Sequence, residues 1–182
     1  MRYPVLIVIL LIFLSGFLFY SCQKWHDPKG YTDPRLTNPY CNDPSAVNYN
    51  WGFPGRPDDS ICYYPTDFYR GRFIYTDSIY LSDNTFSYSK VDTLLFSALS
   101  KTNIAATGFC NFVDSFHFTV DNTIKATLDT VVGGFGQSFC DATDTVNGSI
   151  TIDPIDSSLY HFNLTVNGTA GVTYHLGSAI KE

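Results

Sequence analysis

Five cysteines carry the clearest chemistry in this chain of 182 residues. One of them, Cys22, directly follows an uncharged apolar segment, and the other four are Cys41, Cys62, Cys110 and Cys140. An even number of cysteines in an exported chain is expected to pair, because compartments outside the cytoplasm are oxidising. Three pairings are possible, and we favour the local one, Cys41 with Cys62 and Cys110 with Cys140. Each closed loop would contribute about 3 kcal/mol by restricting the unfolded chain.

Four histidines are the other candidates for metal binding or acid–base chemistry. His26 lies near the amino end, while His117, His161 and His175 fall on the polar faces of predicted strands. If the last hairpin has a three-residue loop, His161 lies opposite His175, and the two imidazoles form a candidate transition-metal site. The plainer interpretation is two polar side chains on a solvated sheet face.

No catalytic motif accompanies these residues, since the sequence contains no HExxH, CxxC, G-x-S-x-G or P-loop pattern. Composition also argues against nucleic acid as a partner. Removal of residues 1–21 takes away Arg2 and leaves 10 basic residues against 17 acidic ones, a formal charge of −7, whereas a phosphate backbone requires a basic surface. We therefore expect a protein that is not an enzyme, needs no cofactor and binds no nucleic acid.

Acidic and amide side chains gather in the segment 41–65, which is dense in Asn, Asp, Pro and Gly. Asp43, Asp58 and Asp59, together with Asn48 and Asn50, could supply the oxygen ligands that Ca²⁺ prefers. The commoner use of such residues is to cap their own turns. Calcium therefore stays a candidate ligand of this segment.

The apolar run of 18 residues from Pro4 to Ser21, preceded by Arg2, has the order of a secretory signal. It resembles a bacterial lipoprotein signal, in which a small residue precedes the cysteine that is cut free and acylated. Ser21 and Cys22 hold those two positions. The resemblance implies a lipid anchor on Cys22 and a place in the cell envelope, at the outer membrane, on its periplasmic face or at the cell surface. An uncleaved signal anchor is the alternative, because 18 residues lie at the short end of what spans a bilayer.

Turn residues and strand alternation divide the rest of the chain. The three prolines of residues 22–40 predict a flexible tether, residues 41–65 a loop module closed by a disulfide, and residues 66–182 an antiparallel β domain. From Asp67 onward apolar side chains recur at every second position. The positions expected on the apolar face include Tyr69, Phe73, Tyr75, Phe116, Phe118, Ile150, Tyr160, Phe162 and Leu164.

Eight to ten short strands without a convincing helix predict a meandering barrel or a sandwich. In the last hairpin, Val172, Tyr174 and Leu176 are expected to continue the apolar face of the preceding strand. Opposed residues of an antiparallel pair share a face, so this arrangement requires a loop with an odd number of residues, such as 167–169.

The segment 41–64 resembles a short module of exported Bacteroidetes proteins, which has the form Cys-x-Asp-Pro-x-Ala-x-Asn-Tyr-Asn, an acidic turn, and Ser-x-Cys-x-Tyr. The matching residues are Cys41, Asp43, Pro44, Ala46, Asn48, Tyr49, Asn50, Asp58, Asp59, Ser60, Cys62 and Tyr64. Residues 66–182 are similar to small lipocalin-like lipoproteins of the same bacteria, through Tyr69-x-Gly71, the strand 148–152 and a terminal hairpin ending in Gly177 and Ala179. These resemblances imply a lipocalin-like barrel, with an immunoglobulin-like sandwich as the competitor, and they imply no reaction.

Five triplets of Asp, then Ser or Thr, then an apolar residue resemble the O-glycosylation acceptor of exported Bacteroidetes proteins. The resemblance implies that some of these hydroxyls are modified. Turn-to-strand junctions produce the same triplets without any sugar. The acceptor residues would be Ser60, Ser78, Thr93, Thr130 and Thr145.

The leading hypothesis is a cell-envelope lipoprotein whose β domain binds a small apolar ligand or a protein partner. The alternative is a surface lipoprotein that binds glycans through exposed aromatic side chains around the module, where Trp51, Phe53, Tyr63 and Tyr64 lie. Packing of these aromatics against the domain is the simpler expectation. A ligand carrier requires an apolar cavity in a closed barrel, whereas a glycan binder requires an aromatic strip on the outside.

Overall fold

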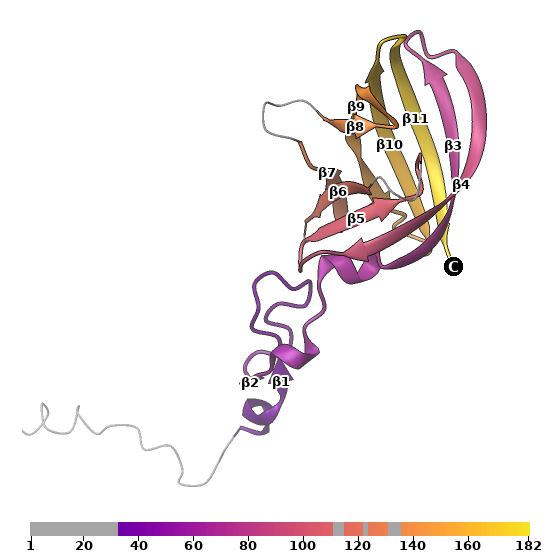
Figure 1. Cartoon of the computed structure of the whole chain (residues 1–182). Helices are drawn as coiled ribbons and strands as arrows, with labels where there is room; N and C mark the ends of the chain where they lie inside the picture. Colours follow the sequence, from indigo (N-terminus) through magenta and orange to yellow (C-terminus); the bar gives the residue numbers. More distant parts are fainter. Residues whose placement is uncertain (1–32, 111–114, 122–123, 131–135) are drawn as a thin grey trace, which may run out of the picture.

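The computed structural model describes residues 33–110, 115–121, 124–130 and 136–182, and its main body is an antiparallel β-barrel (Figure 1). The signal segment and Cys22 lie outside the described residues. Within the described ranges, no helix is long and apolar enough to cross a membrane. The barrel strands are β3 (Gly71–Leu81), β4 (Phe86–Ala98), β5 (Asn103–Thr107), β6 (Ser115–Val120), β7 (Lys125–Leu128), β8 (Gln137–Phe139), β9 (Asp141–Ile152), β10 (Leu159–Gly168) and β11 (Gly171–Lys181).

Eight of these strands close a ring. Neighbours in sequence pair from β3 through β7, β7 pairs with β9, and β9, β10 and β11 follow in order. Pairing of β11 with β3, from Thr173–Leu81 to Lys181–Phe73, joins the two ends. The short β8 adds to the edge of β9 beyond the end of β7. The predicted antiparallel barrel is thus confirmed over the competing sandwich.

The barrel interior is packed with aromatic rings over most of its length. Phe73 and Tyr160 meet edge to face with ring centroids 4.7 Å apart, and Phe118 is fully buried. The Tyr160 hydroxyl donates to the Phe68 carbonyl at 2.6 Å, and burial raises the pKa of Tyr160 to about 12. Alternation on β3, β6 and β10 places these side chains inward, as predicted.

The last hairpin differs from its prediction. Gly168 opposes Gly171, so the loop has two residues, and an even position on β10 faces an odd position on β11. Leu164 therefore opposes His175, which points into the barrel, while Leu176 lies outside and is 47% exposed. The expectation of an odd loop, with Tyr174 and Leu176 on the apolar face, was wrong.

A long-range contact explains this register. The ring of Tyr75 on β3 occupies the interior space beside Gly177, where any Cβ would overlap that ring. Glycine at this inward position of β11 thus makes room for a large side chain from the neighbouring strand. Tyr75 of β3 fills this part of the barrel interior. The inward side chains of β11 are therefore small or polar, and its larger apolar side chains lie on the surface.

A small module precedes the barrel. It comprises the 3₁₀ turns η1 (Pro34–Thr37), η2 (Asp59–Ile61) and η3 (Pro65–Phe68), and the parallel two-residue strands β1 (Pro39–Tyr40) and β2 (Arg56–Pro57). The disulfide between Cys41 and Cys62 closes it, with Cα atoms 5.1 Å apart, which confirms the first predicted pair. Ordered structure begins before Cys41, because η1 and β1 lie in the stretch that was predicted to be tether.

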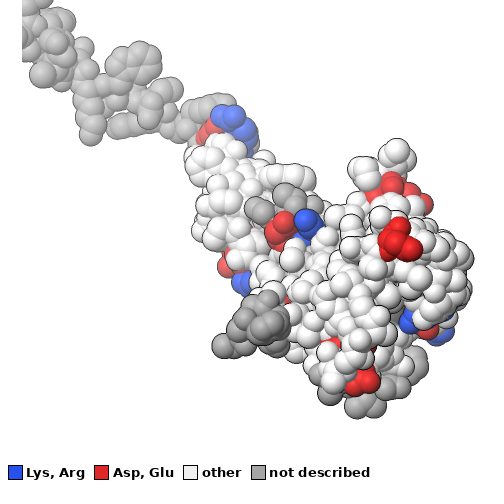
Figure 2. All heavy atoms as spheres, turned by 90° about the horizontal axis from the view of Figure 1, so that it is seen from above, with Lys and Arg blue, Asp and Glu red and all other residues white. Residues whose placement is uncertain are grey.

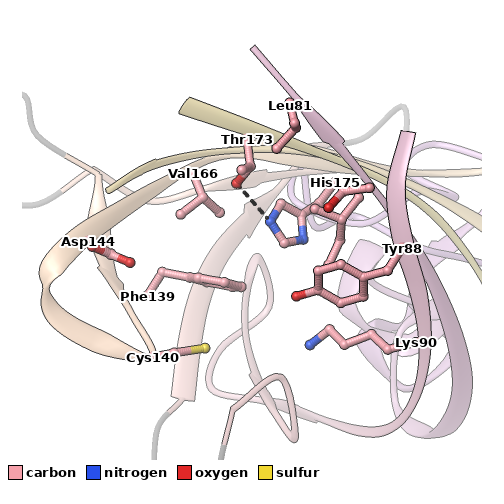
Figure 3. Close-up of a pocket in the computed structure, with 11 residues that line it drawn as sticks. Leu81, Tyr88, Lys90, Phe139, Cys140, Asp144, Val166, Thr173 and His175 are labelled. Carbon is pink, nitrogen blue, oxygen red and sulfur yellow. Dashed lines mark hydrogen bonds between the residues drawn. The ribbon is translucent and has the colours of Figure 1, made fainter. Parts of the chain in front are cut away.

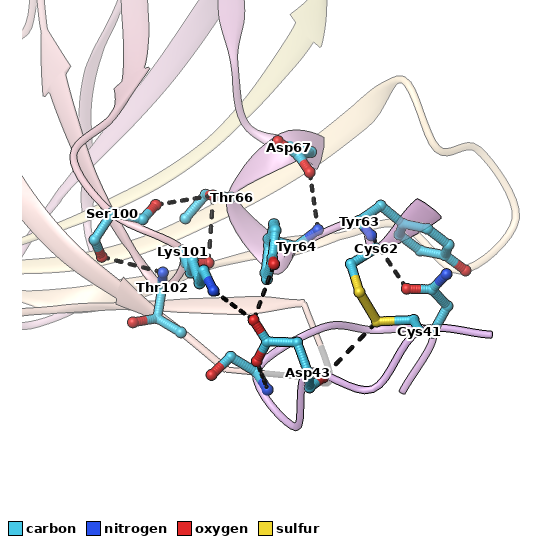
Figure 4. A network of polar contacts seen from close by, with 12 residues as sticks. Cys41, Asp43, Cys62, Tyr63, Tyr64, Thr66, Asp67, Ser100, Lys101 and Thr102 are labelled. Carbon is cyan, nitrogen blue, oxygen red and sulfur yellow. Dashed lines mark hydrogen bonds and ion pairs between the residues drawn. A yellow bond between two sulfur atoms is a disulfide. The ribbon is translucent and has the colours of Figure 1, made fainter. Parts of the chain in front are cut away.

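Polar contacts join the module to the barrel at the β4–β5 turn (Figure 4). The Asp43 carboxylate accepts hydrogen bonds from Lys101 Nζ in that turn and from the Tyr64 hydroxyl, the latter at 2.9 Å. The Thr66 hydroxyl donates toward the carbonyl oxygens of Ser100 and Lys101, at 3.2 and 3.3 Å. The Lys101 ammonium, together with the other donors, lowers the pKa of Asp43 to about 2.

This lowered pKa gives stability a defined pH dependence. A carboxyl group that is more acidic in the folded state stabilises the protein above its unfolded pKa and loses that contribution as the pH falls toward the folded value. We expect Asp43→Asn to lower the urea midpoint near pH 6 and to converge with wild type between pH 4 and about 2. Asp59→Asn is the control, because its exposed side chain makes no polar contact in the described part of the module. Equal midpoints for wild type and Asp43→Asn near pH 6 would contradict this role.

Candidate functional site

Several charged side chains of the long strands lie at positions that face the barrel interior. Figure 2 shows a barrel surface that is mostly uncharged. Asp77 on β3, Lys90 and Asp92 on β4, and His175 on β11 all have the parity of inward positions. Placing ionisable groups in an aromatic interior is costly unless they are paired, so their position makes this part of the barrel the candidate site.

These groups lie beside a pocket of about 400 Å³ at the end of the barrel where the β3–β4 and β10–β11 hairpins turn (Figure 3). This is the end opposite the module (Figure 1). The pocket has one apolar wall and one polar strip. The apolar wall consists of Ile79, Leu81, Phe139 and Val166. The polar strip contains Ser87, Tyr88, Lys90, Thr173 and His175, and Asp144 and Cys140 complete the lining.

A buried histidine–carboxylate pair forms part of the pocket floor. The Nδ1 atom of His175 lies 2.7 Å from Asp77 Oδ2, and the two residues are 5% and 2% exposed. On the other side of the ring, Nε2 lies 3.2 Å from the Thr173 hydroxyl, and the edge of Phe139 packs against the ring at 5.4 Å. With Nδ1 donating to the carboxylate, Nε2 accepts from Thr173, so both ring nitrogens have partners.

A second ion pair lies next to the first. Lys90 directly opposes Asp77 across β3 and β4, and its Nζ lies 2.8 Å from Asp92 Oδ2 and 3.3 Å from the Phe109 carbonyl. The Tyr75 hydroxyl lies at the same level of the barrel. Burial, followed by the nearby Asp77 carboxylate, raises the pKa of Tyr75, which keeps it a neutral phenol.

The Thr173, His175 and Asp77 contacts have the order of a hydroxyl, a base and an orienting acid. Acyl transfer also needs donors for the developing oxyanion next to the hydroxyl. Thr173 lies between Val166 and Leu81 in the sheet, so its backbone is engaged in the β ladder. In Figure 3 the imidazole lies between Thr173 and Lys90, which places the strongest donor of the pocket on the far side of the ring. The arrangement fixes the orientation of His175 better than it activates Thr173.

The second disulfide holds the pocket wall. Cys110 and Cys140 are bonded, with Cα atoms 5.2 Å apart, which confirms the second predicted pair. The neighbouring residues are Phe109, whose carbonyl accepts from Lys90, and Phe139, which packs on His175. The Cys110–Cys140 disulfide therefore restrains Phe109, which contacts the Lys90–Asp92 pair, and Phe139, which contacts the Asp77–His175 pair.

We expect the double variant Cys110→Ala/Cys140→Ala to lose about 3.5 kcal/mol of unfolding free energy, because the bond closes a loop of 30 residues. It should also weaken binding of a fluorescent apolar dye to the pocket, since Phe139 and Phe109 lose their restraint. The matched control is Cys41→Ala/Cys62→Ala, whose loop spans 21 residues and lies far from the pocket. Dye affinity that is the same in both variants would refute the link between this disulfide and the pocket.

Gln137 on β8 is a positioning residue that sequence patterns did not reveal. Its amide accepts from the backbone N–H of His117 at 2.9 Å and donates to the carbonyls of His117 and Asp129, at 2.6 and 2.9 Å. The side chain thus adds to the backbone contact from Asp129 on the side of β6 that faces away from β5, at a place where β7 has ended. It fixes β8, and with it Phe139, in the barrel wall.

The structure does not bring the two predicted metal-site histidines together. His161 opposes Ser178 and lies on the outer surface, 3.0 Å from Asp153, whereas His175 lies inside. Hydrogen bonding from His161 is the largest cause that lowers the pKa of Asp153 to about 2. In the described ranges, no three His, Cys, Asp or Glu side chains form a metal-binding group.

The acidic residues considered for calcium serve separate local contacts. Asp43 is bound to Lys101 and Tyr64, and Asp58 caps η2 by accepting from the Ser60 N–H at 3.0 Å and the Ser60 hydroxyl at 2.6 Å. Asp59 is exposed within η2. The Asn48 amide contacts the backbone of Ile61 and Tyr63, and Asn50 adopts φ 59° at a turn. These contacts match turn capping.

The predicted glycosylation acceptors fall into two classes. Ser60 in η2 and Thr130 after β7 are exposed outside strands. Ser78, Thr93 and Thr145 lie within strands and are half-buried. Asp77, the acid of the triplet at Ser78, is committed to His175 inside the barrel. Glycosylation therefore stays a prediction, and Ser60 and Thr130 are the acceptors best placed for it.

No family model matches the sequence, and no curated protein matches it. Two solved β-barrels are similar to the chain. A redesigned barrel has a TM-score of 0.42 at 14% identity and covers 66% of this chain and 96% of its own. A protein called EF1p2_mFAP2b, solved bound to DFHBI, has a TM-score of 0.44 at 14% identity and covers 65% of this chain and 97% of its own. Likenesses at this level carry no argument about function.

Proposed function

We propose that this chain is a non-enzymatic lipoprotein of the bacterial cell envelope, whose barrel binds a small ligand with an apolar body in the pocket beside His175. The observation that carries the proposal is the buried Asp77–His175 pair next to an apolar wall. Neither residue is needed to fill the core, which aromatic rings occupy, and burying them has a cost. Convergent polar groups at an otherwise apolar pocket are typical of ligand sites, and about 400 Å³ suits a small molecule.

The location follows from the sequence and is supported by the cysteines. Two cysteine pairs at disulfide distance suit the oxidising compartment that the signal segment implies. We place the lipid on Cys22, so that the membrane is one partner and the pocket's small molecule is another. Among the described residues, aromatic rings fill the interior, so we place the ligand at the barrel mouth.

Extraction of the protein in mild detergent, followed by mass spectrometry of the released small molecules, tests the ligand proposal. Wild type should release a compound that is depleted by at least about tenfold from Val166→Phe, because the larger ring fills the pocket. Equal amounts of every released compound from the two proteins would argue against the pocket as the binding site.

Glycan binding is a second candidate, favoured by one observation. Trp51 and Phe53 on the module are 64% and 68% exposed, contrary to the expectation that they pack against the domain. Trp51 meets Tyr63 edge to face at 6.3 Å, which orients its ring. A soluble polysaccharide that quenches tryptophan fluorescence in wild type and not in Trp51→Ala would support this candidate. Failure of a panel of envelope and host glycans to change the signal would remove it.

A further inference from the structure

We infer that the pocket selects an uncharged ligand with an aromatic or apolar body and a hydrogen-bond acceptor, such as a carbonyl, that is held by Lys90 Nζ. The inference rests on the proposed binding function and adds the chemical class of the ligand. The ligand class follows from the hydrogen-bond donors and the charged side chains that line the pocket.

Donor accounting points to Lys90. An ammonium group has three N–H donors, and the Phe109 carbonyl accepts from one of them, while Asp92 Oδ2 lies 2.8 Å from Nζ as its ion-pair partner. Figure 3 shows Nζ directed into the space in front of Phe139. The Tyr88 hydroxyl lies on the same side, and no hydrogen bond of this hydroxyl occurs among the described residues. His175 offers no further donor, because Asp77 and Thr173 occupy both of its nitrogens.

The charges that face the pocket disfavour a charged ligand at the polar strip. The Lys90 ammonium is matched by Asp92, and Asp77 faces His175, so no cation remains to offset the desolvation of a bound anion. Asp144 on the opposite side of the pocket would repel an anion further (Figure 3). A cationic ligand would meet the Lys90 ammonium at the polar strip. An uncharged molecule avoids both penalties.

The apolar wall defines the other half of the ligand. Phe139 presents its ring to the pocket and stacks on Phe116 with centroids 5.6 Å apart, so it is held rigidly. Val166 lies next to it, and Leu81 lines the pocket on the side of Thr173 (Figure 3). A planar apolar body can lie against this wall while its acceptor reaches Lys90, because the polar strip faces the wall across the pocket.

Three naphthalene dyes test the inference. Prodan is uncharged and carries a carbonyl, N-phenylnaphthylamine is uncharged without one, and anilinonaphthalene sulfonate is an anion. We expect prodan to bind most tightly and the sulfonate at least about tenfold more weakly than N-phenylnaphthylamine. Lys90→Met should weaken prodan by about tenfold or more, which is the loss expected for a hydrogen bond to a charged donor, and should change N-phenylnaphthylamine by less than about threefold.

Two further variants protect the test against misfolding. Lys90→Met/Asp92→Asn removes the unpaired carboxylate that the single change leaves, and Tyr88→Phe removes the neighbouring donor at an exposed position. Tyr80→Phe on the outer face is the control. The inferred ligand class is overturned if the sulfonate binds as tightly as the uncharged dyes, or if no Lys90 variant changes prodan binding. Either result would leave the proposal that the pocket binds a small ligand intact. Absence of binding by all three dyes overturns both proposals.

Discussion

Replacing His175 by leucine is expected to lower the free energy of unfolding by about 3–5 kcal/mol, the usual cost of removing one partner of a buried pair. The substitution leaves the Asp77 carboxylate, which is 2% exposed, without its imidazole. Leucine has a volume close to that of histidine, so lost packing does not account for the effect. Urea unfolding followed by far-UV circular dichroism and by the fluorescence of the buried barrel tyrosines measures the change.

The chain provides its own control for this experiment. His161 also contacts an aspartate, Asp153 at 3.0 Å, but its side chain is 49% exposed. His161→Leu should change stability by less than about 1 kcal/mol, as exposed pairs do. The double variant Asp77→Val/His175→Leu should be more stable than His175→Leu alone, because both polar partners are gone. Similar losses for His161→Leu and His175→Leu would show that burial of the pair has no energetic consequence.

The lipid anchor produces the largest expected change in behaviour. We expect the mature wild-type chain to begin at Cys22, with acyl groups adding to its mass, and to partition entirely into detergent. Each buried acyl methylene contributes about 0.8 kcal/mol, so several chains make release negligible. Residues 23–182 exported behind a conventional cleavable signal should partition into the aqueous phase instead. Intact-mass spectrometry and detergent phase partition provide the two measurements.

The intact mass of a Cys22 variant distinguishes a lipid anchor from an uncleaved signal anchor. Cys22→Ala removes the acylation site and should yield a chain that keeps Met1 and carries no acyl mass. A wild-type chain that likewise keeps Met1 would show that the apolar run, rather than a lipid, holds the protein in the membrane.

Local patterns in the sequence predicted much of the barrel. Alternation identified the inward residues of β3, β6 and β10, because each of these strands carries two aromatic rings spaced two residues apart. Proximity in sequence predicted both disulfides. Closure into a barrel depends on the pairing of β11 with β3, about 100 residues apart, and no local pattern decides between that pairing and a sandwich.

The site was harder to predict, because its positions depend on contacts between strands. His175 was placed on the outer face by assuming that the larger apolar residues of the last strand point inward. Tyr75 reverses this by filling the space at Gly177. Asp77 shares its parity with Phe73 and Tyr75, and that signal could have placed a carboxylate inside the barrel from the sequence alone.

Titration with N-phenylnaphthylamine tests most directly whether the barrel mouth is a ligand site. Two valines are compared: Val166, which lines the pocket, and Val91, which is 66% exposed on the outer face. Wild type and Val91→Phe should bind the dye with the same affinity, and Val166→Phe should abolish the fluorescence increase. Equal binding by all three proteins would contradict the assignment of the pocket as the site.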